Sequence, residues 1–156
     1  MKLTSKGRYA VMALADIAKF EDGSPVSLRD ISLRQGISLL YLEQLFSKLK
    51  KDNIVKSLRG VNGGYTLTKN PDEIKLSNIL SAVKEEVKTV QCKKESKKSC
   101  NGSSAKCITH NLWDELETHI QHFFNKKNLG DLIRSKNEKW IWHWNKRKRN
   151  REIKKI

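Results

Sequence analysis

Apolar positions in the first part of the chain recur at helical spacing and predict a run of short helices. Over residues 3–20 they fall at three- and four-residue steps, which indicates a helix with one buried face. That face is predicted to comprise Tyr9, Met12, Ala13, Ile17 and Phe20. A second helix is expected to begin at Ser27, with Asp30 as its capping partner, and to end near Gln35, where Gly36 can adopt the left-handed conformation.

A third helix begins almost at once, capped by Ser38, and the two helices with their glycine-containing turn form a helix-turn-helix pattern. Apolar residues at i, i+3, i+4 and i+7 predict its buried face, which comprises Leu42, Leu45, Phe46 and Leu49. The other face carries Tyr41, Gln44, Ser47, Lys48 and Lys51. A glutamine amide can read adenine in the major groove and lysines suit phosphates, while the same pattern is also typical of an ordinary solvated helix.

Two short runs of alternating residues, 54–58 and 65–68, predict a β-hairpin with a flexible tip at 59–64. A helix-turn-helix followed by a small hairpin is a winged helix. The tip suits a wing that lies on the DNA backbone or enters the minor groove, because an arginine supplies positive charge and three glycines let the protein backbone approach the DNA closely. These residues are Arg59, Gly60, Gly63 and Gly64. A plain surface hairpin is the alternative.

Two further helices are predicted beyond the hairpin. One begins at Ser77 and ends near Val87, with Ile79, Leu80 and Val83 buried. The other spans 112–124, with Thr109 as a candidate cap, and is strongly amphipathic. Its apolar stripe comprises Leu112, Leu116, Ile120, Phe123 and Phe124. A stripe of this size needs a partner: the chain's own first helix, a second copy of the chain, or both. We favour a second copy, because helix-turn-helix proteins that read palindromes are usually dimers.

Composition changes the picture mainly through charge. The 156 residues include 32 Lys and Arg against 17 Asp and Glu, a net charge of +15, which points to an anionic partner such as nucleic acid. Much of the excess lies in residues 136–156, a basic segment with Trp140, Trp142 and Trp144 that we expect to be a disordered tail. The alternative role for this tail is added non-specific DNA affinity.

No apolar run is long enough to span a membrane, and the first residues lack the apolar core of a signal peptide. We therefore expect a cytoplasmic protein with no membrane partner. The odd number of cysteines, three, argues against a disulfide framework.

All three cysteines lie in one loop, spaced Cys92-x7-Cys100-x6-Cys107-x2-His110. Nothing between the first and third cysteine is both large and apolar, so the loop cannot pack as a core, and a bound metal is one means of ordering it. Zinc accepts three thiolates and one imidazole. A two-iron cluster is wider and tolerates ligands from a longer loop, with histidine ligands known in Rieske centres. Three unligated thiols in a disordered lysine-rich loop are the remaining possibility.

Four segments together resemble a known family. The sequences LTSKGRYAVMALADIA, ISLLYLEQLFSKLKK, VKSLRGVNGGYTL and ITHNLWDEL are similar to the bacterial iron–sulfur cluster regulators of the IscR type, a winged-helix family that includes NsrR and RirA. The resemblance covers about residues 1–135. The intervals between the cysteines are slightly longer than is usual in these regulators, and residues 136–156 correspond to no family feature.

The resemblance implies a homodimeric winged-helix transcription factor with one 2Fe–2S cluster per subunit. It assigns the cluster ligands to Cys92, Cys100, Cys107 and His110. It places the DNA-reading helix around Ser38, Tyr41 and Gln44, and the wing at the glycine-rich tip. The predicted DNA-binding residues are Ser38, Tyr41, Gln44, Lys48, Lys51, Arg59, Gly60, Gly63 and Gly64.

We therefore expect a mostly α-helical fold with a small β-wing. Its parts are a winged-helix DNA-binding domain at 1–91, a cluster-binding loop at 92–110, a dimerisation helix region at 111–135 and the tail at 136–156. The expected function is a repressor, with activation also open, that binds palindromic promoter sites in double-stranded DNA and controls iron–sulfur cluster assembly genes.

Two other functions remain open from the sequence: a zinc-stabilised DNA-binding regulator, and an iron–sulfur carrier or redox protein. No Ser-His-Asp order, P-loop or GxGxxG motif is present, so we do not expect an enzyme.

Overall fold

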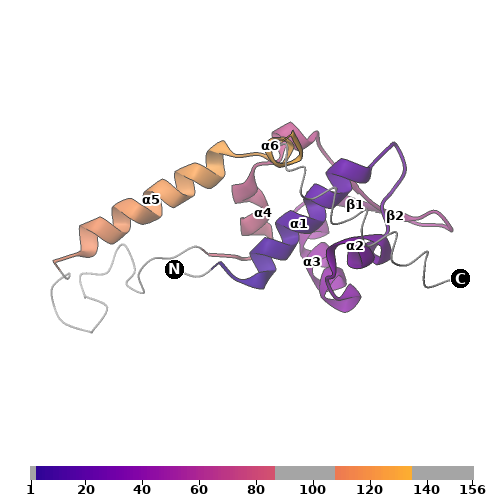
Figure 1. The fold of residues 1–156 in the computed structure, drawn as a ribbon, viewed down its shortest axis with the longest axis horizontal. Helices are drawn as coiled ribbons and strands as arrows, with labels where there is room; N and C mark the ends of the chain where they lie inside the picture. The colour runs from indigo at the N-terminus through magenta and orange to yellow at the C-terminus, as the bar shows by residue number, and fades with distance from the viewer. Residues whose placement is uncertain (1–2, 87–107, 135–156) are drawn as a thin grey trace, which may run out of the picture.

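Within residues 3–86 and 108–134, which the computed structural model describes, helices pack around α1 and a two-stranded sheet lies at the edge of the bundle (Figure 1). The elements in chain order are α1 (Ser5–Phe20), α2 (Leu28–Gln35), α3 (Leu39–Lys51), β1 (Val55–Leu58), β2 (Gly64–Leu67), the 3-10 helix η1 (Pro71–Glu73), α4 (Leu76–Ala82), α5 (His110–Lys126) and α6 (Leu129–Arg134). The expected mostly α-helical winged-helix fold with a small β-wing is confirmed.

Helix α1 is the centre of the core and contacts α2, α3, α4 and α6. Its buried positions include Ala10, Ala13, Leu14 and Ile17, all fully buried. The prediction that Phe20 joins this buried face is wrong, because α1 ends there and the ring remains 37% exposed. Small alanines along α1 let neighbouring helices approach closely, so the core forms around it from side chains of several elements.

The helix-turn-helix forms as the local sequence predicts. The Ser27 hydroxyl oxygen accepts a hydrogen bond from the backbone N–H of Asp30 (3.1 Å), which caps α2. Gly36 ends α2 with φ of 70°, in the left-handed region that glycine adopts without strain. Helix α3 then buries the four predicted residues, Leu42, Leu45, Phe46 and Leu49.

The wing is an antiparallel hairpin in which Val55 pairs with Leu67 and Leu58 with Gly64. Two contacts hold it against α3: the ring of Phe46 packs edge-on against Tyr65, with centroids 4.8 Å apart, and the Lys50 ammonium donates to Ser57 Oγ (2.7 Å). The orientation of the wing relative to α3 is therefore fixed by core packing as well as by chain connectivity.

Helix α4 begins at Leu76, one residue before the predicted cap. Ser77 does not cap it, and its hydroxyl has no hydrogen-bond partner. The predicted burial of Ile79, Leu80 and Val83 is confirmed. The predicted end near Val87 lies outside the described residues, but regular helix ends at Ala82.

Helix α6 has no counterpart among the predicted elements. Its first residue, Leu129, is fully buried and contributes to the common core, with its N–H bonded to the carbonyl of Ile74 (2.9 Å). An ion pair from Arg134 to Asp72 (2.6 Å) adds a second link between α6 and η1. The chain therefore returns from α5 to the winged helix through α6.

Helix α5 extends away from this core and meets it only near its own C-terminal half, as Figure 1 shows. It begins at His110, two residues before the predicted start, and ends at Lys126. Thr109 precedes it as the N-cap but makes no capping hydrogen bond through its side chain. No described helix is long and apolar enough to cross a membrane.

A buried ion pair fixes the first helix of the helix-turn-helix to α1. Arg34 Nε donates to both Asp16 carboxylate oxygens at 3.0 Å, and Arg34 Nη2 donates to Asp16 Oδ1. The Gln35 amide donates to Asp16 Oδ2 (2.6 Å). The Asp16 side chain is completely buried. The Arg34 guanidinium also lies over the Phe20 ring, 4.5 Å from its centroid.

We predict that Asp16→Ala lowers the free energy of unfolding by about 3 kcal/mol, because it leaves a partly buried guanidinium and a buried amide without their acceptor. Urea denaturation followed by circular dichroism measures this change. Arg29→Ala is the control, because Arg29 is an exposed arginine on α2, the helix that carries Arg34. Equal stability of the two variants would contradict a structural role for the Asp16 ion pair.

Candidate DNA-binding surface and metal-ligand segment

The face of α3 opposite the core is exposed over most of its length. Gln44, Ser47, Lys48 and Lys51 are all exposed, as the sequence pattern predicts. Tyr41 differs from the prediction, because it is only half exposed and its ring packs edge-on against Tyr9 with centroids 5.9 Å apart. The tyrosine therefore anchors the start of α3 to α1 and borders the exposed face.

Ser38 precedes α3 as its N-cap residue, but its side chain makes no capping hydrogen bond. The first turn of α3 holds no acidic residue. Because unpaired N–H groups and the helix dipole at this end favour an anion, the arrangement is compatible with a nearby phosphate. The Ser38 side chain is exposed at this end.

The wing tip presents Arg59 to solvent, and its backbone turns through Gly60, which has φ of 120°. The turn is closed by a hydrogen bond from the Gly63 N–H to the Gly60 carbonyl (3.0 Å). A Cβ at Gly63 would lie 2.5 Å from the Leu58 carbonyl oxygen.

At Gly64, too, a neighbouring backbone carbonyl leaves no space for a side chain. A Cβ at this position would lie 2.5 Å from the carbonyl oxygen of Val26, whose backbone forms a β-bridge with Tyr65. Gly63 is thus needed for the turn of the hairpin and Gly64 for the close approach of β2 to Val26, roles that the sequence pattern did not indicate.

Of the four predicted metal ligands, only His110 lies among the described residues; Cys92, Cys100 and Cys107 lie outside them. His110 is the first residue of α5 and is buried, with 6% of its surface exposed. Within residues 3–86 and 108–134, no three potential ligands gather at one point. The helix start therefore holds the imidazole directly after the segment that carries the cysteines.

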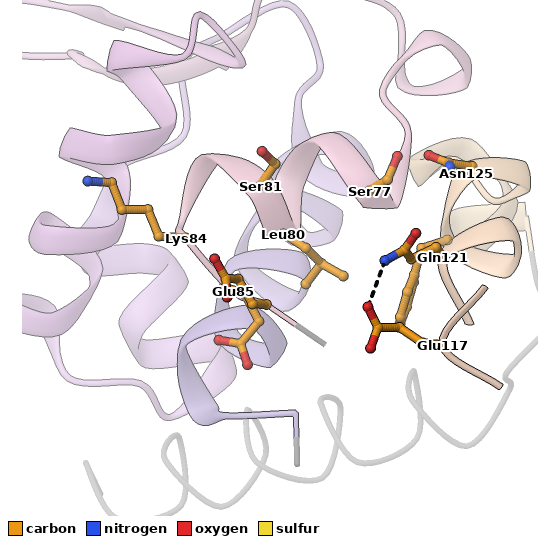
Figure 2. A pocket seen from close by; sticks show the side chains of 10 residues that line it. Ser77, Leu80, Ser81, Lys84, Glu85, Glu117, Gln121 and Asn125 are labelled. Atoms are coloured by element: carbon orange, nitrogen blue, oxygen red, sulfur yellow. Dashed lines mark hydrogen bonds between the residues drawn. The ribbon is translucent and has the colours of Figure 1, made fainter. Parts of the chain in front are cut away.

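A cleft of about 560 Å³ separates α4 from α5. Figure 2 shows Leu80 and Glu85 on one side of it and Glu117 and Gln121 on the other, with the Gln121 amide donating to the Glu117 carboxylate (3.4 Å). Glu117 is buried although it lies in the middle of α5. Apolar side chains, Leu80 and Phe124, line the cleft together with the polar ones, and the cleft leaves α5 unsealed against the winged helix over part of its length.

Glu85, three residues after α4, joins this part of the chain to the start of α1 through hydrogen bonds. Its carboxylate accepts from the Thr4 backbone N–H (2.8 Å) and from the Thr4 hydroxyl (2.5 Å), while Lys6 Nζ lies 3.8 Å away. Burial by itself raises the pKa of Glu85, but the Thr4 hydrogen bonds and the Lys6 charge outweigh it and hold the pKa below its ordinary value.

The Glu85 contact was not predicted, because its partners are 81 residues apart in the sequence. Thr4 is the N-cap residue of α1, yet its side chain makes no capping hydrogen bond and donates to Glu85 instead.

The helix-turn-helix, the wing held against it and the exposed polar face of α3 define a winged-helix DNA-binding protein. The sequence profile of the Rrf2 family, described as iron-dependent transcriptional regulators, matches residues 3–135. The chain belongs to this family.

Relatives of known structure and sequence agree with this assignment. The transcriptional regulator IscR of Aliivibrio salmonicida is 51% identical over 133 residues, which cover 85% of this chain and 77% of the relative. The structure of T. potens IscR superposes with a TM-score of 0.70 at 33% identity, covering 88% of this chain and 90% of the other. The structure of CymR, the global cysteine regulator of B. subtilis, gives 0.72 at 28% identity, covering 85% and 96%.

These findings confirm the predicted resemblance and the predicted class of function. The chain is a DNA-binding transcription regulator of the IscR type, and the family consists of regulators rather than enzymes.

Glu85→Gln should lower the free energy of unfolding by about 1–2 kcal/mol at neutral pH, because hydrogen bonds to a charged acceptor are stronger than those to a neutral one. The difference should shrink in acid. The pKa of Glu85 is lowered by folding, so its stabilisation is present above the ordinary pKa and is lost as pH falls through the folded value. Urea denaturation at pH values from neutral to about 3 measures both effects.

Thr4→Val is the matched variant for this experiment, since it removes the hydroxyl donor and keeps the backbone N–H. It should reduce the acid-sensitive stabilisation in part. Parallel pH profiles for the wild type and Glu85→Gln would show that the charge of Glu85 does not stabilise the fold.

Proposed function

We propose that this regulator responds to iron–sulfur cluster status by holding one 2Fe–2S cluster per subunit through Cys92, Cys100, Cys107 and His110. The observation that carries the proposal is the position of His110, a buried imidazole at the first residue of α5, three residues after the last cysteine. The relatives named IscR support the same assignment. Control of cluster-assembly genes, by repression or activation, is implied by the resemblance, and we propose a cytoplasmic location for such a DNA-binding regulator.

The donor set fits such a cluster chemically. Three thiolates and a neutral imidazole match iron, and the five lysines at 93, 94, 97, 98 and 106 favour deprotonated thiols and an anionic centre. When bound, the cluster would supply a group whose presence depends on iron supply and whose charge depends on its oxidation state. The protein's own residues hold the two sides of the cysteine-bearing segment, Glu85 three residues after α4 and His110 at the start of α5.

The fold connects this segment to the DNA-binding surface. Helix α4 packs against both α1 and α3, and α5 contacts α4. A change in the conformation of the segment between α4 and α5 therefore alters how α5 lies on the winged helix, which is a shift between two populations with different DNA affinity.

Double-stranded DNA would contact the exposed face of α3 and the wing. Gln44 is assigned to base reading and Lys48 and Lys51 to phosphates, with Ser38 and Tyr41 at the start of the helix and Arg59 at the wing tip. Gly60, Gly63 and Gly64 shape that tip so that its backbone can approach the DNA.

A homodimer on palindromic sites is the proposed assembly. Helix α5 exposes large apolar side chains in a row, with Leu112 58% and Phe123 55% exposed and Leu116 between them. Apolar surface of this kind on a helix that extends from the core suits a second copy of the same helix.

A zinc-stabilised regulator is the second candidate, because zinc accepts the same four ligands.

We predict that Cys92→Ala, Cys100→Ala and Cys107→Ala each abolish the visible absorption of anaerobically purified protein and leave the winged helix folded. His110→Cys should retain a cluster with a lower reduction potential, because a thiolate adds negative charge. Absorption spectra, iron and sulfide analysis, and circular dichroism measure these outcomes. A colourless protein with one bound zinc per chain would replace the cluster proposal with the zinc one, and full absorption in any cysteine variant would remove that residue from the ligand set.

Gln44→Ala should cost about 1–3 kcal/mol of discrimination at one base position. Lys48→Ala should instead weaken binding evenly across sequences and reduce the slope of log affinity against log salt by about one, because it removes one phosphate contact. Binding to a duplex library at several salt concentrations distinguishes the two effects. Lys126→Ala, on the far end of α5, is the control, and an unchanged sequence preference in Gln44→Ala would rule out base reading by Gln44.

A further inference from the structure

The exposed face of α3 carries one apolar side chain in line with its polar ones. Leu40 lies in the first turn of α3 and is 67% exposed. At 3.6 residues per turn, positions 40, 44, 47 and 51 form one row along the helix, on the side away from the buried residues. The other three members of the row, Gln44, Ser47 and Lys51, are polar and exposed.

Neither the helix nor the core accounts for leucine at this position. The start of a helix favours side chains that accept hydrogen bonds or carry negative charge, and leucine does neither. The buried contacts of α3 come from Leu42, Leu45, Phe46 and Leu49, on the opposite side. Leu40 therefore leaves apolar surface in water, which a contact made only in a complex would bury.

We propose that Leu40 is a specificity-determining residue that packs against the C5-methyl group of a thymine in the major groove. The N-terminal residues of a recognition helix are those that reach base edges, and the thymine methyl is the apolar group that the major groove offers there. Leu40 precedes Gln44 by one helical turn, so the two side chains read neighbouring positions of one half-site. The inference rests on the proposed binding of DNA by this face of α3.

The test begins with selection of a preferred duplex from a randomised library by the purified full chain. Each thymine of that duplex is then replaced in turn by uracil, which removes the methyl group alone. The wild type should lose about fourfold in affinity at one thymine of each half-site, the equivalent of burying one methyl group. Leu40→Ala should bind the thymine and uracil duplexes equally, and it should fold normally because an exposed alanine favours a helix.

Leu132→Ala is the matched control, because Leu132 is an exposed leucine on α6. It should keep the wild-type preference for thymine. A wild type that selects a duplex but does not distinguish any thymine from uracil, or a Leu40→Ala variant that still does, overturns the role of Leu40 and leaves DNA binding intact. A chain that selects no duplex overturns the DNA-reading surface and the role of Leu40 with it.

Discussion

Close packing against α1 is the constraint on which the other elements depend. Its buried side includes Gly7, Ala10 and Ala13, and a Cβ at Gly7 would lie 2.9 Å from both Glu85 Cγ and Leu80 Cδ2. Small residues thus bring the backbone of α1 within direct reach of the end of α4. A larger side chain here would separate the two helices and break the contact that holds the start of the chain to the segment before the cysteines.

Two buried carboxylates orient the helices that this packing brings together. Asp16 holds α2 through Arg34, and Glu85 holds the first residues of the chain through Thr4. A buried carboxylate is tolerated only when its hydrogen-bond partners are in place, so each contact penalises other placements of its helix more strongly than apolar packing alone would. The helix-turn-helix is in this way a rigid unit before it meets any partner.

Local sequence signals predicted the parts of the fold that local interactions determine. The capping of α2 by Ser27, the left-handed Gly36 and the buried face of α3 all depend on residues within one or two turns of each other. The start of α4, the docking of α6 and the Thr4–Glu85 contact depend instead on partners far along the chain, so periodicity could not show them. Asp16 carried a weak signal, a single acid among the alanines of α1, but its partner could not be read from spacing.

The features of the candidate DNA-binding surface can also be separated into those set by local sequence and those set by distant partners. The exposure of Gln44, Lys48 and Lys51 follows from the helical period, because a helix that buries one side must expose the other. The partial burial of Tyr41 does not, since it arises from the ring of Tyr9 on another helix. The steric need for Gly63 and Gly64 likewise comes from backbone carbonyls that approach only in the folded protein, that of Leu58 within the wing and that of Val26 before α2.

This packing also limits how a signal in the cysteine-bearing segment could reach DNA. The helix-turn-helix and the wing together form the reading unit. The Asp16 ion pair, the packing of Phe46 against Tyr65 and the Lys50–Ser57 hydrogen bond fix its internal geometry. Helix α3 therefore has little freedom relative to the wing. Helix α5 is different, because a cleft lies between part of it and α4, and its outer side is apolar and exposed. In the proposed dimer, the adjustable quantity is therefore the placement of one rigid reading unit relative to the other. Because such a dimer must meet two half-sites at a set spacing, a small rotation of α5 would be enough to change operator affinity without any change within α3.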